Sequence, residues 1–176
     1  MTTADGGTDK LSPVLEAALS LLEGQVTGYH AFRGDDTVLV KASHRLEGTR
    51  ALKDAEGLAF DLLMDTTVVD WPDDDERFEV VDHLFSTKHH HRLRVKYRVT
   101  EEDPSIPSIT PLYGSANWME REAWDMFGVK FAGHPDLRRI LLYEEFEGFP
   151  LRKDYDKLDA QPLFEPRYHG TRESDG

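Results

Sequence analysis

The sequence contains no cysteine, and this absence excludes several classes of protein. Without thiols the chain forms no disulfide, and it lacks the ligands that hold most iron–sulfur clusters and structural zinc ions. Long hydrophobic runs are also missing, because stretches such as 17–22 fall far short of the ~18 apolar residues that a membrane-spanning helix needs. The segment 1–10 has neither the basic nor the apolar region of a secretion signal. We therefore expect a soluble protein of the cytoplasm.

Basic side chains are few, with 21 Lys and Arg against 34 Asp and Glu, which gives a net charge of −13 when His is neutral. An acidic surface repels phosphates, so we expect no nucleic acid as the main partner. With 176 residues, 39% of them hydrophobic, the chain is long enough to bury a core, and its length favours one domain.

Local motifs of catalysis and nucleotide binding are missing as well. The sequence has no Gly-x-Gly-x-x-Gly fingerprint, no phosphate-binding loop, no Gly-x-Ser-x-Gly elbow and no His-Glu-x-x-His zinc helix. These absences do not exclude a catalytic site that is assembled from residues distant in the sequence.

Hydrophobic periodicity predicts a chain that mixes helices and strands. Ser12 is placed to cap the first helix, and Gly34-Asp35-Asp36 to form a hairpin turn. The predicted helices cover 11–23, 45–63 and 115–127, and the predicted strands cover 26–32, 37–42, 67–71, 78–85 and 92–99.

The predicted strand 92–99 alternates strictly between apolar and basic residues. Its basic face can pair with carboxylates of the preceding segment, among them Glu76, Glu79 and Asp82. We favour a solvated or salt-bridged outer face, with a docking surface for an acidic neighbour as the alternative. The apolar face consists of Leu93, Val95, Tyr97 and Val99, and the basic face of Arg92, Arg94, Lys96 and Arg98.

The run His89-His90-His91 is the most metal-like feature. On a strand, His89 and His91 would share one face about 6.6 Å apart, and His83 could supply a third ligand. The run lies where a hairpin loop is expected, however, and basic residues follow it. We therefore favour a polar loop over a metal site.

The predicted helix 115–127 is apolar over more than half of its circumference, which indicates that it is covered from two sides. Its polar strip includes Arg121 and Asp125, whose i,i+4 spacing predicts an ion pair within the helix. Glu120 projects into the apolar arc instead, where a carboxylate must be paired or take part in chemistry. One interpretation makes Glu120 a general acid or base together with Glu122 or His134. The interpretation we favour is structural, with Glu120 paired to Arg138, Arg139 or Arg152.

Beyond this helix the chain becomes rich in Gly, Pro and charge yet keeps many large apolar side chains. Such a segment cannot cover its own apolar groups, so we expect it to lie against another protein. We divide the chain into a disordered start (1–10), an α/β domain (11–130), an extended C-terminal segment that wraps a partner (131–168) and a disordered tail (169–176). The apolar series of the C-terminal segment is Leu137, Ile140, Leu141, Phe146, Phe149 and Leu151.

The stretch from 120 to 155 resembles the C subunit of the proton-pumping NADH:quinone oxidoreductase, respiratory complex I. The resemblance rests on EREAWDMFGV (120–129), GHPDLRRIL (133–141), FEG (146–148) and PLRKDY (150–155). The motif residues, which we expect to serve the interface and the structure, are Glu120, Arg121, Glu122, Asp125, Phe127, Gly128, His134, Pro135, Asp136, Leu137, Arg138, Arg139, Phe146, Gly148, Pro150, Leu151, Arg152, Lys153, Asp154 and Tyr155.

The resemblance implies an α/β fold of the α+β type, in which a mixed sheet packs with helices and an extended irregular segment follows. It also implies a structural subunit of the hydrophilic arm with no catalytic, cofactor-binding or metal-binding residue of its own. Flavin, iron–sulfur clusters and quinone would belong to other subunits, and the D subunit at the quinone chamber would be the chief neighbour. The complex would lie on the cytoplasmic side of the inner membrane, with this chain attached peripherally.

Two alternatives stay open. One is the equivalent subunit of a membrane-bound nickel–iron hydrogenase-type complex. The other is a stand-alone acid–base hydrolase that uses Glu120, Glu122 and His134.

Overall fold

The computed structural model describes residues 11–156, 158 and 161–162. The predictions of disorder for 1–10 and 169–176 concern residues outside this part. Within it, no helix has the length and apolar character needed to span a membrane.

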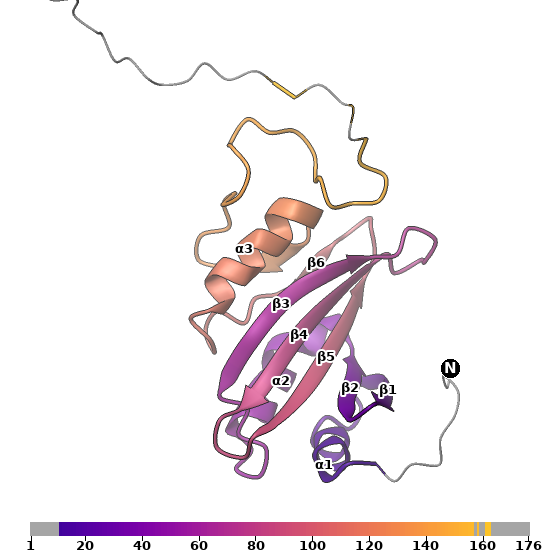
Figure 1. The fold of residues 1–176 in the computed structure, drawn as a ribbon, viewed down its shortest axis with the longest axis vertical. Coiled ribbons are helices and arrows are strands. Elements are labelled where there is room, and N and C mark those ends of the chain that lie inside the picture. Colours follow the sequence, from indigo (N-terminus) through magenta and orange to yellow (C-terminus); the bar gives the residue numbers. More distant parts are fainter. Residues whose placement is uncertain (1–10, 157, 159–160, 163–176) are drawn as a thin grey trace, which may run out of the picture.

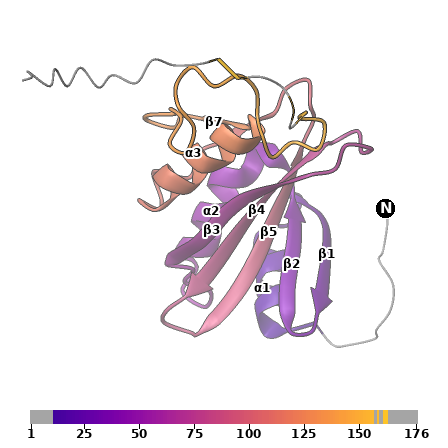
Figure 2. The ribbon, with the colours of Figure 1, turned by 45° about the horizontal axis from the view of Figure 1, so that its top comes forward.

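Five strands form one mixed sheet in the order β1-β2-β5-β4-β3 (Figures 1 and 2). Neighbouring strands are antiparallel except β2 and β5, which run parallel. With the helices described below, this sheet confirms the predicted α+β fold. The strands are β1 (Val26–Phe32), β2 (Asp35–Val40), β3 (Leu62–Asp70), β4 (Phe78–Ser86) and β5 (His91–Val99).

In the part of the chain that the structure describes, three α-helices accompany the sheet: α1 (Pro13–Leu21), α2 (Arg45–Asp54) and α3 (Ala116–Phe127). A short 3-10 turn, η1 (Ala42–His44), leads into α2. In the view of Figure 1, α2 lies behind the sheet and α3 runs beside β3, and Figure 2 shows α1 behind β2. A second, parallel pair of short strands, β6 (Ser105–Pro107) and β7 (Lys130–Ala132), flanks α3 in the sequence.

The beginning of the chain folds largely as its local signals predict. The Ser12 hydroxyl accepts a hydrogen bond from the Leu15 N–H at 3.0 Å, which confirms the predicted cap of α1. The first hairpin turn is shorter than expected. It consists of Arg33 and Gly34, whose φ angles of 52° and 83° are those of a two-residue turn, so Asp35 already belongs to β2.

The predicted helix 45–63 is wrong in its second half, because α2 ends at Asp54. The chain then turns, with Ala59 at a φ of 45°, and places Leu58 and Phe60 in the core without helical backbone. β3 begins at Leu62, five residues before the strand expected at 67–71.

The two-faced pattern of β5 is confirmed: its apolar side chains are buried, and its basic ones lie on the outer face of the sheet. Glu79 on β4 pairs with Lys96 at 2.8 Å and with Arg98 at 3.0 Å. The predicted role of Asp82 on this face is wrong. Asp82 stands opposite Val95 in the register and therefore points into the core.

Candidate functional site

Glu120 of α3 is fully buried and points toward the sheet. Its carboxylate accepts hydrogen bonds from the Arg45 guanidinium at 2.8 Å, the Ser108 hydroxyl at 2.6 Å and the Ile109 N–H at 2.9 Å. The predicted pairing of Glu120 with Arg138, Arg139 or Arg152 is therefore wrong. Each of those three arginines binds another group: Arg138 pairs with Asp136, Arg139 pairs with Asp125, and Arg152 donates to the Phe127 carbonyl.

Arg45, at the start of α2, is fully buried and connects this helix to β4, β6 and α3. Its guanidinium donates to both oxygens of Asp82 on β4, at 2.9 and 2.8 Å, and to the Pro107 carbonyl at 3.0 Å. Burial lowers the pKa of Arg45, but the carboxylates of Asp82 and Glu120 raise it more, and the result lies above the ordinary value. Arg45 therefore stays a cation. This Arg45 cluster (Arg45, Asp82, Glu120) fixes α3 against the sheet.

Arg121 and Asp125 point away from the sheet and hold the C-terminal segment. Arg121 donates to the carbonyl oxygens of Arg138 at 3.1 Å and Arg139 at 3.2 Å. Asp125 binds the Arg139 guanidinium at 2.7 Å. The predicted ion pair between Arg121 and Asp125 is wrong, because each side chain finds its partner in the chain that returns over α3.

The buried Asp125 carboxylate also receives the backbone N–H groups of Ile140, Leu141 and Leu142, at 3.0, 2.8 and 3.0 Å. Burial raises the pKa of Asp125, but the hydrogen bonds from Arg139 and from these N–H groups lower it more, and the result lies below the ordinary value. A carboxylate held in this way stays ionised and acts as the anchor of the irregular chain around it.

The end of α3 is fitted closely to the C-terminal segment. Gly128 closes the helix at a φ of +81°, and a Cβ placed there would lie 2.6 Å from a ring carbon of Phe149 and 2.7 Å from Arg152. Arg152 donates to the Phe127 carbonyl at 2.6 Å, and its guanidinium lies between the rings of Phe78 and Phe149. Glycine is needed here both for the backbone angle and for the space.

A third attachment lies where β3 ends. Asp70 and Asp154 share the Arg77 guanidinium, at 2.7 Å each, and Asp70 also accepts the Lys153 N–H at 2.7 Å. The hydrogen bond from Arg77 holds the pKa of Asp154 below its usual range. Residues 138–154 therefore fold back on their own chain at three places: the middle of α3, the end of α3 and the end of β3.

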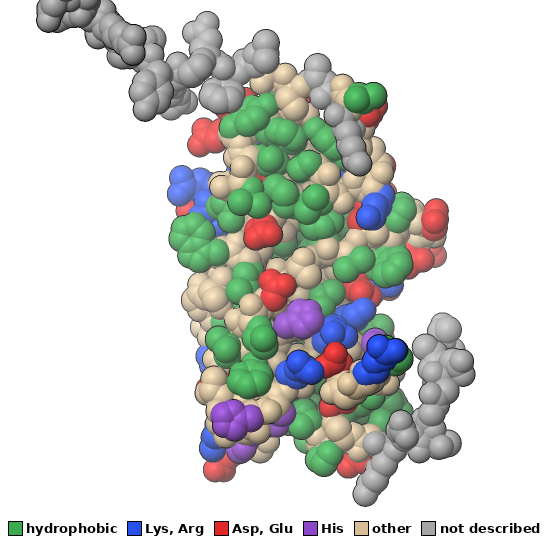
Figure 3. Space-filling model, in the orientation of Figure 1, with side chains coloured by type: hydrophobic (Ala, Val, Ile, Leu, Met, Phe, Trp, Pro, Cys, Tyr) green, Lys and Arg blue, Asp and Glu red, His purple; other side chains and the backbone are tan. Residues whose placement is uncertain are grey.

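Some apolar side chains of this region remain uncovered. Leu141, Leu151 and Trp118 are exposed by 61%, 51% and 63%. In Figure 3 hydrophobic side chains gather over α3 and the C-terminal segment, at the top of the view.

The structure does not assemble an acid–base site from Glu120, Glu122 and His134. Glu120 is sealed in the Arg45 cluster, and Glu122 is exposed on another side of α3. The His134 ring accepts the Asp136 N–H at Nδ1 and bonds the Asn117 carbonyl through Nε2. Each of the three therefore has a separate environment.

Of the three histidines considered as metal ligands, His89 and His91 lie together, with stacked rings whose centroids are 5.6 Å apart, but His83 does not join them. His89 and His91 bond the carbonyl oxygens of Glu56 at 2.9 Å and Leu58 at 2.7 Å. His83 stands opposite Arg94 on the outer face of the sheet, whereas His91 continues the inner face of β5. In the part of the chain that the structure describes, no three metal-ligating side chains converge.

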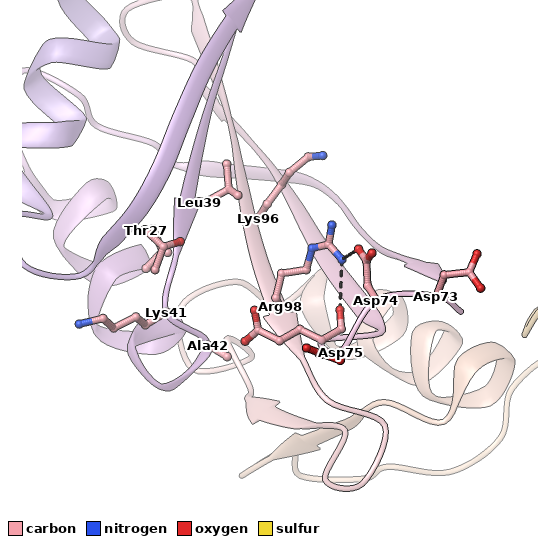
Figure 4. Close-up of a pocket in the computed structure, with 11 residues that line it drawn as sticks. Thr27, Leu39, Lys41, Ala42, Asp73, Asp74, Asp75, Lys96 and Arg98 are labelled. Carbon is pink, nitrogen blue, oxygen red and sulfur yellow. Dashed lines mark hydrogen bonds and ion pairs between the residues drawn. The ribbon is translucent and has the colours of Figure 1, made fainter. Parts of the chain in front are cut away.

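A cavity of about 770 Å³ lies between β1, β2 and the acidic turn 73–76 (Figure 4). Arg98 meets this turn by donating to Asp74 at 2.9 Å and to the Glu76 carbonyl at 3.1 Å. Figure 4 shows Lys41 and Lys96 pointing in different directions, so the basic groups do not converge on one point. The candidate functional site is therefore α3 with the segment that it holds.

Comparison with known proteins identifies the family of the chain. Residues 38–161 match the family described as "Respiratory-chain NADH dehydrogenase, 30 Kd subunit". The C subunit of the NADH-quinone oxidoreductase of Paramagnetospirillum magneticum is 46% identical over 84% of this chain and 74% of its own length. That of Hyphomonas neptunium is 40% identical over 90% of this chain and 83% of its own length.

Solved structures agree. A trypsin-resistant fragment (1–134) of Nqo5 is 36% identical with a TM-score of 0.59, and the match covers 70% of this chain and 96% of that one. A chain of the membrane-bound sulfane sulfur reductase, an archaeal respiratory membrane complex, is 25% identical with a TM-score of 0.70, over 82% of this chain and 85% of that one. The chain belongs to the family of the respiratory-chain NADH dehydrogenase 30 Kd subunit, which is that of the C subunit of NADH-quinone oxidoreductase, and is a subunit of complex I.

Proposed function

We propose that this chain is a cofactor-free structural subunit of the hydrophilic arm of complex I. It supports the module that reduces quinone while electron transfer from NADH is coupled to proton translocation. Flavin, iron–sulfur clusters and quinone are held by other subunits, and the D subunit is its chief neighbour. The chain lies on the cytoplasmic side of the inner membrane and is attached to it through the complex.

One observation carries the proposal: the polar groups of the motif are occupied in holding the C-terminal segment. Arg121, Asp125 and Arg139 bind backbone and side-chain groups of the same chain, so they are not free for catalysis. The large apolar side chains of Leu141 and Leu151 are left outside instead. Burying such a side chain contributes roughly 1.5–3 kcal/mol, so this arrangement favours attachment to another protein.

We further propose that residues 134–155, within the predicted C-terminal segment (131–168), are the main partner-binding element. The folded body extends to about Gly133, because β7 pairs with β6 and Phe131 is buried beside Arg45. The resistance of the Nqo5 fragment to trypsin supports a body that is stable without the end of the chain.

The test is a truncation after Gly133, which keeps β7. A tagged full-length chain and the truncated chain are expressed in place of the native subunit, and each is purified from detergent-solubilised membranes. We expect the full-length chain to bring down the other members of the complex, including the D subunit, with NADH:quinone reductase activity. The truncated chain is expected to stay folded, as shown by circular dichroism, and to bring down none of them.

A finer variant tests the exposed apolar groups. Leu141→Ser with Leu151→Ser is expected to lower the recovery of partner subunits, whereas Phe32→Ser on β1, at 66% exposure, serves as the matched control. Normal assembly and activity of the truncated chain would show that the C-terminal segment is not the attachment.

A second host complex is favoured by one observation, the similarity to a chain of the sulfane sulfur reductase complex. A related respiratory membrane complex is therefore the alternative host. The identities of the co-purified subunits decide between the two.

A further inference from the structure

The Asp125–Arg139 pair joins helix α3 to a segment without helix or strand. Residues 133–156 contain turns, bends and irregular backbone, so no ladder of backbone hydrogen bonds fixes their shape. Asp125 provides the hydrogen bonds that hold this segment instead. One carboxylate oxygen accepts hydrogen bonds from three consecutive N–H groups, and the other accepts one from the Arg139 guanidinium at 2.7 Å. Successive N–H groups that converge on one anion form a nest, and here the anion is part of the chain.

Arg139 extends the same arrangement to the far side of the loop. The guanidinium, whose side chain is only 13% exposed, donates to the carbonyl oxygens of Phe146 at 2.9 Å and Gly148 at 3.1 Å. It also lies between 5.6 and 5.7 Å from the ring centroids of Trp124, Phe146 and Phe149. The planar fork of arginine is suited to this geometry, and a lysine cannot reproduce it.

Leu141 is carried by this loop and points outward. Its N–H is bound to Asp125, while its side chain is 61% exposed. A segment that is ordered only when its partner binds loses conformational entropy at that moment, which weakens binding. A loop that is already ordered avoids that loss.

We propose that Asp125 is a positioning residue that sets residues 138–149 in their partner-binding shape before any partner is bound. It acts through Arg139 and the N–H groups of 140–142. This inference rests on the proposed function, since it assumes that the C-terminal segment is the attachment.

Hydrogen exchange of the purified full-length chain tests whether residues 138–149 are ordered before a partner binds. In the native chain the N–H groups of 140–142 are expected to exchange slowly although they lie outside helices and strands. Asp125→Asn keeps the size of the side chain and removes its charge, and we expect exchange at 140–142 to become at least tenfold faster. Glu122→Gln is the matched control, an exposed carboxylate on the same helix, and is expected to leave exchange unchanged.

Two further measurements separate positioning from general stability. Arg139→Lys keeps the charge and is expected to show the same loss of protection, which provides a second variant if Asp125→Asn does not fold. Both variants are then tested for recovery of partner subunits from membranes, where we expect a several-fold reduction while the circular dichroism of the purified chain is retained.

Slow exchange at 140–142 in both variants would overturn the inference. Fast exchange with normal recovery of partners would also overturn it, since the preset shape would then be irrelevant to assembly. In that case the truncation after Gly133 decides separately about the proposed function: if the truncated chain fails to assemble, the attachment stands and only the inference about Asp125 fails.

Discussion

Replacing Arg45 by methionine removes the one cation that two buried carboxylates share. The guanidinium makes four hydrogen bonds of 3.0 Å or less, to Asp82, Glu120 and the Pro107 carbonyl, and all three charged side chains are fully buried. Methionine fills much of the space but leaves Asp82 and Glu120 without a cation in the core.

The expected cost follows from the burial. Removing one partner of a buried ion pair destabilises a protein by about 3–5 kcal/mol, because an uncompensated charge is left behind. Native domains are stable by only about 5–15 kcal/mol, so this is a large fraction of the total. For a chain of this length each kcal/mol corresponds to about 2–4 °C, which predicts a fall in Tm of roughly 6–20 °C.

Urea and thermal unfolding of the purified chain, followed by circular dichroism, measure this effect. Arg92→Met is the matched control, because Arg92 is 67% exposed and pairs with Asp35 at the surface, where an ion pair contributes about 0–1 kcal/mol. The triple variant Arg45→Met, Asp82→Asn, Glu120→Gln is expected to regain part of the lost stability, because no unpaired charge then remains.

Two results would refute the reasoning. One is an Arg45→Met variant that loses no more stability than Arg92→Met. The other is a triple variant that is less stable than the single one, since the cost would then come from packing and not from unpaired charge.

Two other changes have predictable effects on the C-terminal segment. Gly128→Ala combines backbone strain at a φ of +81° with a clash against Phe149, and is expected to make the C-terminal segment sensitive to trypsin. Gly133→Ala is the control, because its φ of +83° is similar but the space around it is open. Equal trypsin sensitivity of the two variants would show that the clash with Phe149 is not the cause. The pKa of Asp154 is lowered by Arg77, so its contribution to stability is complete above about pH 4 and is lost as the pH falls through the lower, folded-state pKa. When the pH is lowered below about 4, the urea concentration at the midpoint of unfolding is expected to decrease, and to decrease less in Asp154→Asn. An identical decrease in the two proteins would contradict this assignment.

Much of the fold could be predicted from the sequence where the pattern is local. β5 is a clear case, because its strict alternation allows only one buried face. The helix α3 is another, since its apolar positions repeat at helical spacing over 12 residues. The second half of the predicted helix 45–63 failed because Leu58 and Phe60 occupy positions that fit a helix but are buried by a turn.

The candidate site was predictable in its residues and not in its contacts. The position of Glu120 in the apolar arc indicates a buried partner, but Arg45 lies on a largely polar helix far earlier in the chain, and only the folded topology brings them together. Arg121 and Asp125 have the spacing of an ion pair, and a local rule therefore pairs them. In the structure, Arg121 binds a carbonyl group and Asp125 binds N–H groups of the chain that returns over α3, and these contacts replace the local ion pair.

The parallel pairing of β2 with β5 has a consequence for the order in which the chain folds. β1 and β2 form a local hairpin as soon as they are made, but the inner edge of β2 is completed only by residues 94–96. Contacts between strands that are distant in the sequence form slowly, and an open strand edge can pair with other chains in the meantime. A nascent chain that stops before Arg94 therefore leaves the edge of β2 at Val38 unpaired, and is expected to aggregate or be degraded before it reaches the complex.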